Sequence, residues 1–216
     1  MEEWTPNNIE DLFELDVHEL GALADSINRG NGNIVTFVVN RHINYSNICV
    51  SRCPLCAFYR DANDSDAYFM SVEEILEKVA DAVTMGATEL HIVGSLYPEM
   101  SMEYFEEMFS QIKSRFPQVI IKALTAAEIR FLSQIEKMSA EEVLLRLKDV
   151  GLQAMPGGGA EILDDEIREV ICPKKVKAEE WLQIMEIAHN LGIKSNATML
   201  FGHIEEPRHR AVHLYT

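Results

Sequence analysis

Three cysteines lie within eight residues, in the run Cys49-Val-Ser-Arg-Cys53-Pro-Leu-Cys56. Thiolate sulfur is the usual protein ligand of iron–sulfur clusters, and four thiolates normally hold a cluster of four irons. A [4Fe–4S] cluster held by only three thiolates leaves one iron without a protein ligand. That iron can bind a substrate or a cofactor, so the spacing predicts a reactive iron–sulfur centre at Cys49, Cys53 and Cys56.

Two other interpretations of these cysteines remain open at the level of sequence. Reduced cysteines are often buried in a core, although three so close together in a loop argue against this. A zinc site would need a fourth ligand for tetrahedral coordination, and Cys172 and His42 are the candidates. Disulfides are disfavoured, because the start of the chain, Met1-Glu2-Glu3-Trp4, lacks the pattern of a secretion signal.

The rest of the chain alternates between apolar stretches and amphipathic segments. Ser71 and Glu74 have the spacing of a capping box, and apolar residues then recur at helical spacing as far as Gly86. Similar patterns predict helices around 102–112, 139–147 and 181–188. The apolar stretches predict strands at 34–39, 90–93, 119–123, 152–155 and 194–201, with a short extended stretch at 42–44.

This alternation predicts parallel strands with helices packed outside them, either as an open doubly wound sheet or as a (β/α) barrel. Polar clusters follow successive strands, which favours a barrel, because a barrel collects its active site at the carboxyl ends of its strands. About five strand–helix units can be recognised, whereas a closed barrel needs eight. We therefore expect an N-terminal helical segment at 1–33 and a partial TIM-type (β/α) barrel at 34–216 that lacks the last strands.

Composition narrows the class of protein. Hydrophobic residues make up 47% and charged residues 25% of the 216 residues, which is ordinary for one globular domain with a core. The net charge of -16 argues against nucleic acid as a partner, because phosphate contacts need a basic surface. No apolar run approaches the length of a membrane span, so we expect a cytoplasmic protein without a membrane partner.

Two loops that follow predicted strands suit ligand binding. Gly157, Gly158 and Gly159 allow backbone to approach a substrate closely, and Glu161 offers a carboxylate as a polar anchor and candidate catalytic group. Thr125 and Glu128 could hydrogen-bond a cofactor. The alternative for these two residues is a helix cap in which Thr125 accepts from the Glu128 amide.

Three polar residues near the end of the chain are further candidates. Asn196 and Thr198 share one face of the last predicted strand, and we expect them to point into the barrel toward a substrate. His203 follows them and is a candidate for proton transfer, although a lone histidine is more often structural. Cys172 is expected to pack or to lie beside the substrate rather than to bind the cluster.

The C-x3-C-x2-C motif is similar to that of the radical S-adenosylmethionine superfamily. Residues 40–49 (NRHINYSNIC), 56–58 (CAF) and 155–161 (MPGGGAE) resemble one branch of it, the menaquinone-biosynthesis and deazaflavin-synthase enzymes. Within this branch, 171–173 (ICP) and 194–203 (KSNATMLFGH) look most like the aminodeoxyfutalosine synthase family. The resemblance extends from about residue 16 to residue 213.

The resemblance implies a particular reaction. A [4Fe–4S] cluster would reduce S-adenosylmethionine to a 5'-deoxyadenosyl radical, with S-adenosylmethionine consumed as a substrate. In this family the radical adds to the enol ether of 3-[(1-carboxyvinyl)oxy]benzoate, and rearrangement and decarboxylation give 6-amino-6-deoxyfutalosine for menaquinone. The resemblance also implies an electron donor such as flavodoxin or ferredoxin, and a segment at Gly94 and Ser95 whose backbone approaches the methionine part of the cofactor.

The sequence departs from the family pattern at three positions. Leu55 stands where an aromatic residue usually precedes the third cysteine, and Ser95 and Tyr97 interrupt the usual Gly-Gly-Leu-His-Pro. Two rival functions therefore stay open. One is a sister enzyme, either dehypoxanthine futalosine cyclase or a deazaflavin synthase subunit, and the other is an inactive metal-binding remnant.

Overall fold

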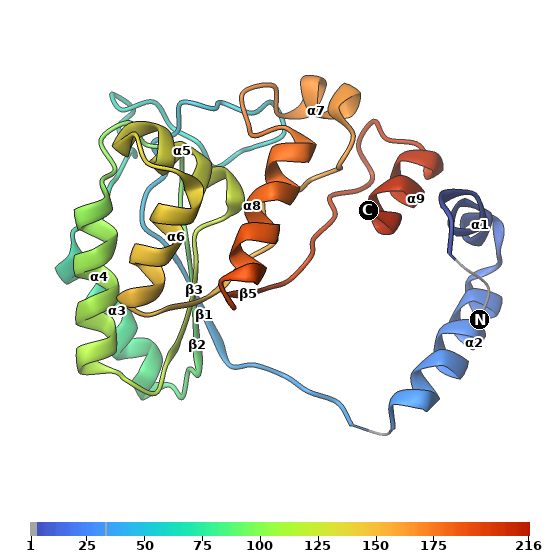
Figure 1. Cartoon of the computed structure of the whole chain (residues 1–216), viewed down its shortest axis with the longest axis horizontal. Coiled ribbons are helices and arrows are strands. Elements are labelled where there is room, and N and C mark those ends of the chain that lie inside the picture. Colours follow the sequence, from blue (N-terminus) through green and yellow to red (C-terminus); the bar gives the residue numbers. More distant parts are fainter. Residues whose placement is uncertain (1–3, 33) are drawn as a thin grey trace.

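The computed structural model describes residues 4–32 and 34–216. Five parallel strands form one sheet in which each strand pairs with the next along the chain (Figure 1). They are β1 (Asn40–Asn44), β2 (Glu89–Val93), β3 (Ile120–Ala123), β4 (Leu152–Met155) and β5 (Lys194–Ser195). This strand order is that of a (β/α) barrel, and the sheet is open, which confirms the expected partial barrel.

Helices lie between successive strands and pack on one face of the sheet (Figure 1). On this face are α3 (Val72–Thr84), α4 (Met102–Arg115), α5 (Ala126–Glu136), α6 (Ala140–Asp149) and α8 (Ala178–Asn190). The short helix α7 (Asp165–Ile171) follows β4 at the carboxyl ends of the strands.

Local sequence signals determine where these helices begin and end. Reciprocal capping boxes start α3 at Ser71, α5 at Thr125 and α6 at Ser139, as the spacing of Ser or Thr with Glu predicts. Gly86 and Gly151 follow α3 and α6 with φ of 87° and 117°, in the left-handed region that favours glycine. The predicted helix boundaries at these positions are confirmed.

The two faces of the sheet differ in chemistry, because alternate residues of a strand point to opposite sides. The helix-covered face is apolar and forms the main core, with Leu90, Ile92 and Ile121 fully buried. Burial of each such side chain stabilises the fold by roughly 1.5–3 kcal/mol before the cost of ordering it.

The opposite face carries polar side chains from β1, β2 and β3. Glu89 accepts a hydrogen bond from Asn40 and forms an ion pair with Lys122 at 2.6 Å. Farther along the strands, the rings of His42 and His91 lie with their centroids 4.9 Å apart. In a barrel this face lines the interior.

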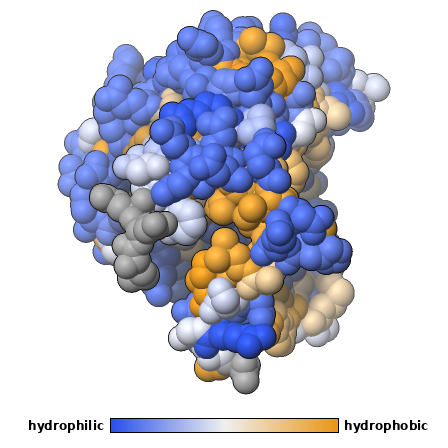
Figure 2. Space-filling view, turned by 90° about the vertical axis from the view of Figure 1, so that its right-hand side faces the viewer, coloured by the Kyte–Doolittle hydropathy of each residue, from blue (hydrophilic) through white to orange (hydrophobic). Residues whose placement is uncertain are grey.

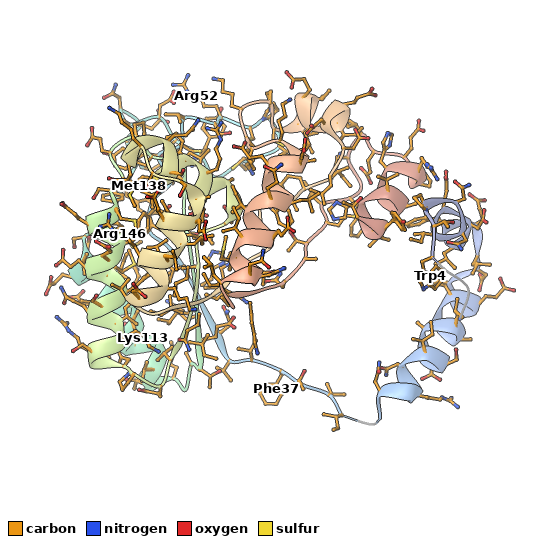
Figure 3. The ribbon with its side chains drawn as sticks, viewed as in Figure 1. Trp4, Phe37, Arg52, Lys113, Met138 and Arg146 are labelled. Carbon is orange, nitrogen blue, oxygen red and sulfur yellow. The ribbon has the colours of Figure 1, made fainter. Side chains whose placement is uncertain are left out.

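Two predicted strands differ from the structure. Residues 34–39 form no strand, and the first strand is instead the following stretch that includes 42–44. The prediction of a strand at 34–39 rests on its hydrophobic residues, but Val35 and Phe37 are 91% and 88% exposed on a segment that leads to β1 (Figure 3). The strand predicted at 194–201 ends at Ser195, so Asn196 and Thr198 do not share a strand face.

The N-terminal helices α1 (Pro6–Asp11) and α2 (Val17–Asn28) lie apart from the sheet, and α1 lies beside α9 (Pro207–Tyr215) (Figure 1). Helix α1 packs on α9, and Arg208 donates to Asn7 and pairs with Glu10. Apolar surface is exposed among hydrophilic areas on this side of the molecule (Figure 2), and Val17 and Ile27 of α2 contribute to the exposed apolar side chains. Residues 1–3 and 33, the latter at the expected domain boundary, lie outside the described residues.

Across 4–32 and 34–216, no helix is both long and apolar enough to cross a membrane.

His213 of α9 connects that helix to two loops of the barrel. Its Nδ1 accepts from the Leu163 amide and its Nε2 lies 3.0 Å from the Thr198 carbonyl, so the ring is neutral with the proton on Nε2. Burial lowers the pKa of His213 below its usual 6.5, and Arg168 lowers the same pKa further.

We expect His213 to make folding stability depend on pH. Below pH 6.5 the unfolded chain binds a proton that the folded chain resists, so stability falls as pH falls, by at most about 1.4 kcal/mol per pH unit for this one group. Denaturant unfolding of wild type and His213→Gln between pH 7.5 and 5.5 should give a shallower dependence in the variant. His91, whose pKa burial lowers to about 4, contributes the same sign in both proteins. Equal slopes would contradict this role of His213.

Candidate functional site

The loop that carries the cysteines begins directly after β1 and is held by its own polar contacts. The side chain of Asn47 accepts from the Tyr68 amide at 2.8 Å and donates to the Asp66 carbonyl at 2.9 Å. Arg60 pairs with the Asp66 carboxylate at 2.8 Å and exchanges backbone hydrogen bonds with Asn47 and Cys49. These contacts fix the path of the chain on both sides of the cysteine motif.

The three cysteines line one pocket at the carboxyl ends of β1, β2 and β3, which we call the cysteine pocket. Its wall consists of Asn47, Cys49, Cys53, Cys56, Phe58, Tyr59, Val93, Gly94, Ser95, Leu96, Thr125, Ala127, Glu128, Gly159 and Lys175. The pocket therefore lies where barrel enzymes place their active sites. In Figure 3, Arg52, which lies between the first two cysteines, is at this end of the sheet, and Lys113 is near the opposite end.

Two of the cysteine sulfurs already have hydrogen-bond partners. The Leu96 amide donates to Cys49 Sγ at 3.4 Å, and Ser51 Oγ lies 3.1 Å from Cys53 Sγ. Burial raises the pKa of the Cys53 thiol, whereas the contact with Ser51 and the charge of Lys175 lower it. Donors to sulfur are a recognised means of stabilising cluster thiolates and tuning their potential.

The residues present fit a [4Fe–4S] cluster. All three thiols of the motif line one pocket, whereas Cys172 lies outside its wall, so the pocket offers three sulfur ligands. Among residues 4–32 and 34–216, no three or more Cys, His, Asp or Glu side chains form a group that could hold a single metal ion. His42 projects from the polar face of β1 beside His91 and is likewise absent from this wall.

Gly94 and Ser95 lie in the wall of the cysteine pocket, at the end of β2. A Cβ on Gly94 would come within 2.7 Å of the Tyr45 ring, so only glycine fits between this ring and the pocket. The Ser95 hydroxyl oxygen is buried, and within the described part of the chain it has no hydrogen-bond partner. A buried hydroxyl without a partner is costly, and a ligand that accepts its hydrogen bond would remove this cost.

Thr125 and Glu128 also lie in the pocket wall, and they form the N-terminal cap of α5. Thr125 Oγ1 accepts from the Glu128 amide at 3.3 Å, while Glu128 Oε2 accepts from the Thr125 amide and hydroxyl at 2.7 and 2.8 Å. Glu128 Oε1 accepts from Tyr45 Oη at 2.8 Å and from the Gly94 amide at 2.9 Å. The carboxylate thus joins β1, β2 and α5 beneath the pocket, and each of its oxygens already accepts two hydrogen bonds.

The glycine loop after β4 meets the cysteine pocket at one residue only. Gly159, with φ of 83°, lies in the pocket wall. Gly157 instead packs on the chain after β5, where an added Cβ would lie 2.2 Å from the Asn196 carbonyl oxygen. The Gly158 carbonyl accepts from the Trp181 indole at 3.3 Å.

Buried Arg168 of α7 supports this loop from behind. Its guanidinium donates to the carbonyl groups of Gly159, Ala160, Ile162 and Val176. One side chain therefore holds the glycine loop and the turn after α7 together.

The structure places three other candidate residues outside the wall of the cysteine pocket. Thr198 donates through its hydroxyl to the Gly157 carbonyl at 2.5 Å, and Asn196 is exposed beside β5. His203 Nε2 lies 3.0 Å from the Leu200 carbonyl, and its Nδ1 lies 3.2 Å from Glu205. Their roles toward a substrate stay predictions.

Lys175 is a pocket residue that sequence reasoning missed. It follows α7, and its ammonium group forms an ion pair with Glu161 at 2.6 Å. The only signal for it in the sequence is its place two residues after Pro173, within a segment that resembles the family. Phe58 is a second missed residue, and it supplies an aromatic ring to the pocket although Leu55 does not line it.

Residues 43–215 match the family model of the radical SAM superfamily, and the chain belongs to this family. Its members use a [4Fe–4S] cluster with S-adenosylmethionine. The solved structure of methylornithine synthase shares the fold, with a TM-score of 0.77 at 17% identity, over 99% of this chain and 60% of that one.

Curated relatives carry three different names. A 5-amino-6-(D-ribitylamino)uracil–L-tyrosine 4-hydroxyphenyl transferase of Methanopyrus kandleri is 46% identical over 82% of this chain and 48% of its own length. An aminodeoxyfutalosine synthase of Streptomyces coelicolor is 42% identical over 94% of the chain and 53% of its own length. A cyclic dehypoxanthine futalosine synthase of the same organism is 40% identical over 97% and 54%. The chain thus spans about half the length of these relatives.

Proposed function

We propose that this chain carries the radical-generating half of an aminodeoxyfutalosine synthase. The observation that supports the proposal most is the cysteine pocket, whose wall contains Cys49, Cys53 and Cys56 together with Gly94 and Ser95. The family-like segments 155–161 and 194–203 add support, since they lie together through the contacts of Gly157 with Asn196 and Thr198.

In the proposed reaction the bound cluster and S-adenosylmethionine supply a 5'-deoxyadenosyl radical, which adds to 3-[(1-carboxyvinyl)oxy]benzoate to give 6-amino-6-deoxyfutalosine. Cys49, Cys53 and Cys56 would hold the cluster. Gly94, because it has no side chain, lets the end of β2 lie against Tyr45 and still face the pocket. An electron donor such as flavodoxin or ferredoxin completes the proposal.

The protein's own residues would position the substrate and exclude water. Gly159 presents backbone to the cysteine pocket, and the loop contacts of Gly157, Gly158 and Thr198 hold it there. We propose Asn196 and His203 as substrate-side residues contributed by the loop after β5.

A second candidate is the tyrosine 4-hydroxyphenyl transferase reaction, which is favoured by the names of several relatives at 40–46% identity. Both candidates, like the cyclase, use the same cysteine pocket. They differ in the small molecule that the radical attacks.

Direct assay of the substrates separates the candidates. The protein is reconstituted anaerobically with iron and sulfide, reduced, and given S-adenosylmethionine with each substrate in turn, and products are identified by mass spectrometry. We expect 6-amino-6-deoxyfutalosine from 3-[(1-carboxyvinyl)oxy]benzoate. Product from tyrosine with 5-amino-6-(D-ribitylamino)uracil, or from dehypoxanthine futalosine, would overturn the assignment in favour of the respective sister enzyme.

A further inference from the structure

Lys175 is held in the wall of the cysteine pocket by the structure around it. Its amide donates to the Cys172 carbonyl at 3.0 Å in the turn that ends α7. The carbonyl of the next residue, Val176, accepts a hydrogen bond from Arg168. The side chain is 21% exposed. A lysine side chain is long and loses much rotamer freedom when it is fixed, so this placement needs a compensating interaction.

Glu161 provides that interaction from outside the pocket wall. Its Oε1 lies 2.6 Å from Lys175 Nζ, and its side chain is 15% exposed. Glu161 has a φ of 46°, so its backbone adopts a strained left-handed conformation to make this turn. Burial lowers the pKa of Lys175, but the charge and hydrogen bond of Glu161, together with Cys53 and Cys172, outweigh burial and raise this pKa.

Lys175 is the source of positive charge in the described wall of the cysteine pocket. Within the part of the chain that the structure describes, Lys175 is the only Lys or Arg in this wall. The carboxylate of Glu128 already accepts four hydrogen bonds, so it is not a free partner for a ligand. An ammonium group in the wall of such a pocket is suited to an anionic oxygen ligand.

We propose that Lys175 binds the α-carboxylate of the methionine end of S-adenosylmethionine, and that Glu161 is the positioning residue that holds Lys175 for this contact. The inference rests on the proposed function, which requires that S-adenosylmethionine binds in this pocket. It adds roles in that binding for Lys175 and Glu161, which lie outside the cysteine motif. Glu161 then acts through Lys175 rather than on the substrate itself.

The test is a comparison of two ligands on the reconstituted protein with its cluster left oxidised, so that S-adenosylmethionine is bound but not cleaved. Equilibrium dialysis gives the Kd of S-adenosylmethionine and of its decarboxylated form, which has the same adenosyl and sulfonium groups but no carboxylate. For Lys175→Gln we expect at least a tenfold weaker Kd for S-adenosylmethionine, because a charged hydrogen bond is lost, and an unchanged Kd for the decarboxylated form. Lys175→Arg should restore part of the affinity, and Glu161→Gln should show a smaller loss with the same selectivity.

Lys174→Gln is the matched control, because Lys174 is an exposed neighbour outside the cysteine pocket, and its Kd values should equal those of wild type. A Lys175→Gln protein that binds both ligands as wild type does, or loses both equally at normal iron content, would overturn this inference alone. Failure of the wild-type protein to bind S-adenosylmethionine would instead overturn the proposed function, and the inference with it.

Discussion

Replacing Cys53 with serine is expected to remove the iron–sulfur cluster and to lower product formation by at least a thousandfold. Cys53 is buried in the middle of the motif, and a serine hydroxyl does not replace a thiolate as a ligand of iron. Iron and acid-labile sulfide, measured after anaerobic reconstitution, should fall to background. The same result is expected for Cys49→Ser and Cys56→Ser.

Cys172→Ser is the control for this prediction. Cys172 is as buried as Cys53 and belongs to the same small apolar cluster, with Ile162, Ile167 and Ile171, but it does not line the cysteine pocket. This variant should keep full iron and sulfide, with a modest loss of stability. Loss of cluster in Cys172→Ser together with retention in Cys53→Ser would assign the ligands differently and contradict the account.

Replacing Glu128 with alanine is expected to cost about 3–5 kcal/mol of folding stability. The side chain is buried, and its loss leaves the Tyr45 hydroxyl, the Gly94 amide and the Thr125 amide and hydroxyl without their acceptor. Denaturant unfolding, followed by circular dichroism, measures the change. Glu128 accepts from the Gly94 amide, and Gly94 and Ser95 line the cysteine pocket. The variant should therefore also bind S-adenosylmethionine more weakly.

Glu142→Ala separates the buried role of Glu128 from ordinary helix capping. Glu142 forms the same reciprocal capping box with Ser139 at the start of α6, but it is exposed, and among the described residues only Ser139 donates hydrogen bonds to its carboxylate. Loss of such a cap costs about 1 kcal/mol. Equal losses in the two variants would show that Glu128 is only a cap and does not hold the strand ends together.

The sequence predicts most of the fold, because its strongest signals are local. Capping pairs such as Ser71 with Glu74, and a terminating glycine such as Gly86, define a helix from contacts within a few residues. The four-residue strand β4, in which Gln153 is the one polar residue, is likewise flanked by Gly151 and Pro156, and its predicted bounds match the structure.

The first and last strands could not be predicted correctly, because their boundaries depend on pairing rather than on hydrophobicity. β1 is Asn-Arg-His-Ile-Asn, in which only Ile43 is buried, and its register with β2 defines it. The apolar stretch at 34–39 has no strand beside it. After Ser195 the chain leaves the sheet to pack on Gly157, which is a tertiary contact without a local signal.

The candidate site was predictable where residue type and spacing alone identify the chemistry, as for the three cysteines. Gly94, Ser95, Thr125, Glu128 and Gly159 could be expected at strand ends, and the structure brings all of them to the cysteine pocket. Lys175 could not be found in this way, because a lysine in a turn has no distinctive spacing. Only the fold brings its side chain beside the cysteines and Glu161.

The most direct test of the central claim is electron paramagnetic resonance of the reconstituted, reduced protein with and without S-adenosylmethionine. The account predicts a [4Fe–4S] signal that changes when the cofactor is added, because a cluster held by three cysteines would leave one iron open to it in the pocket that Ser95 and Lys175 also line. A cluster signal indifferent to S-adenosylmethionine, or a protein that takes up zinc and no iron or sulfide, would contradict it.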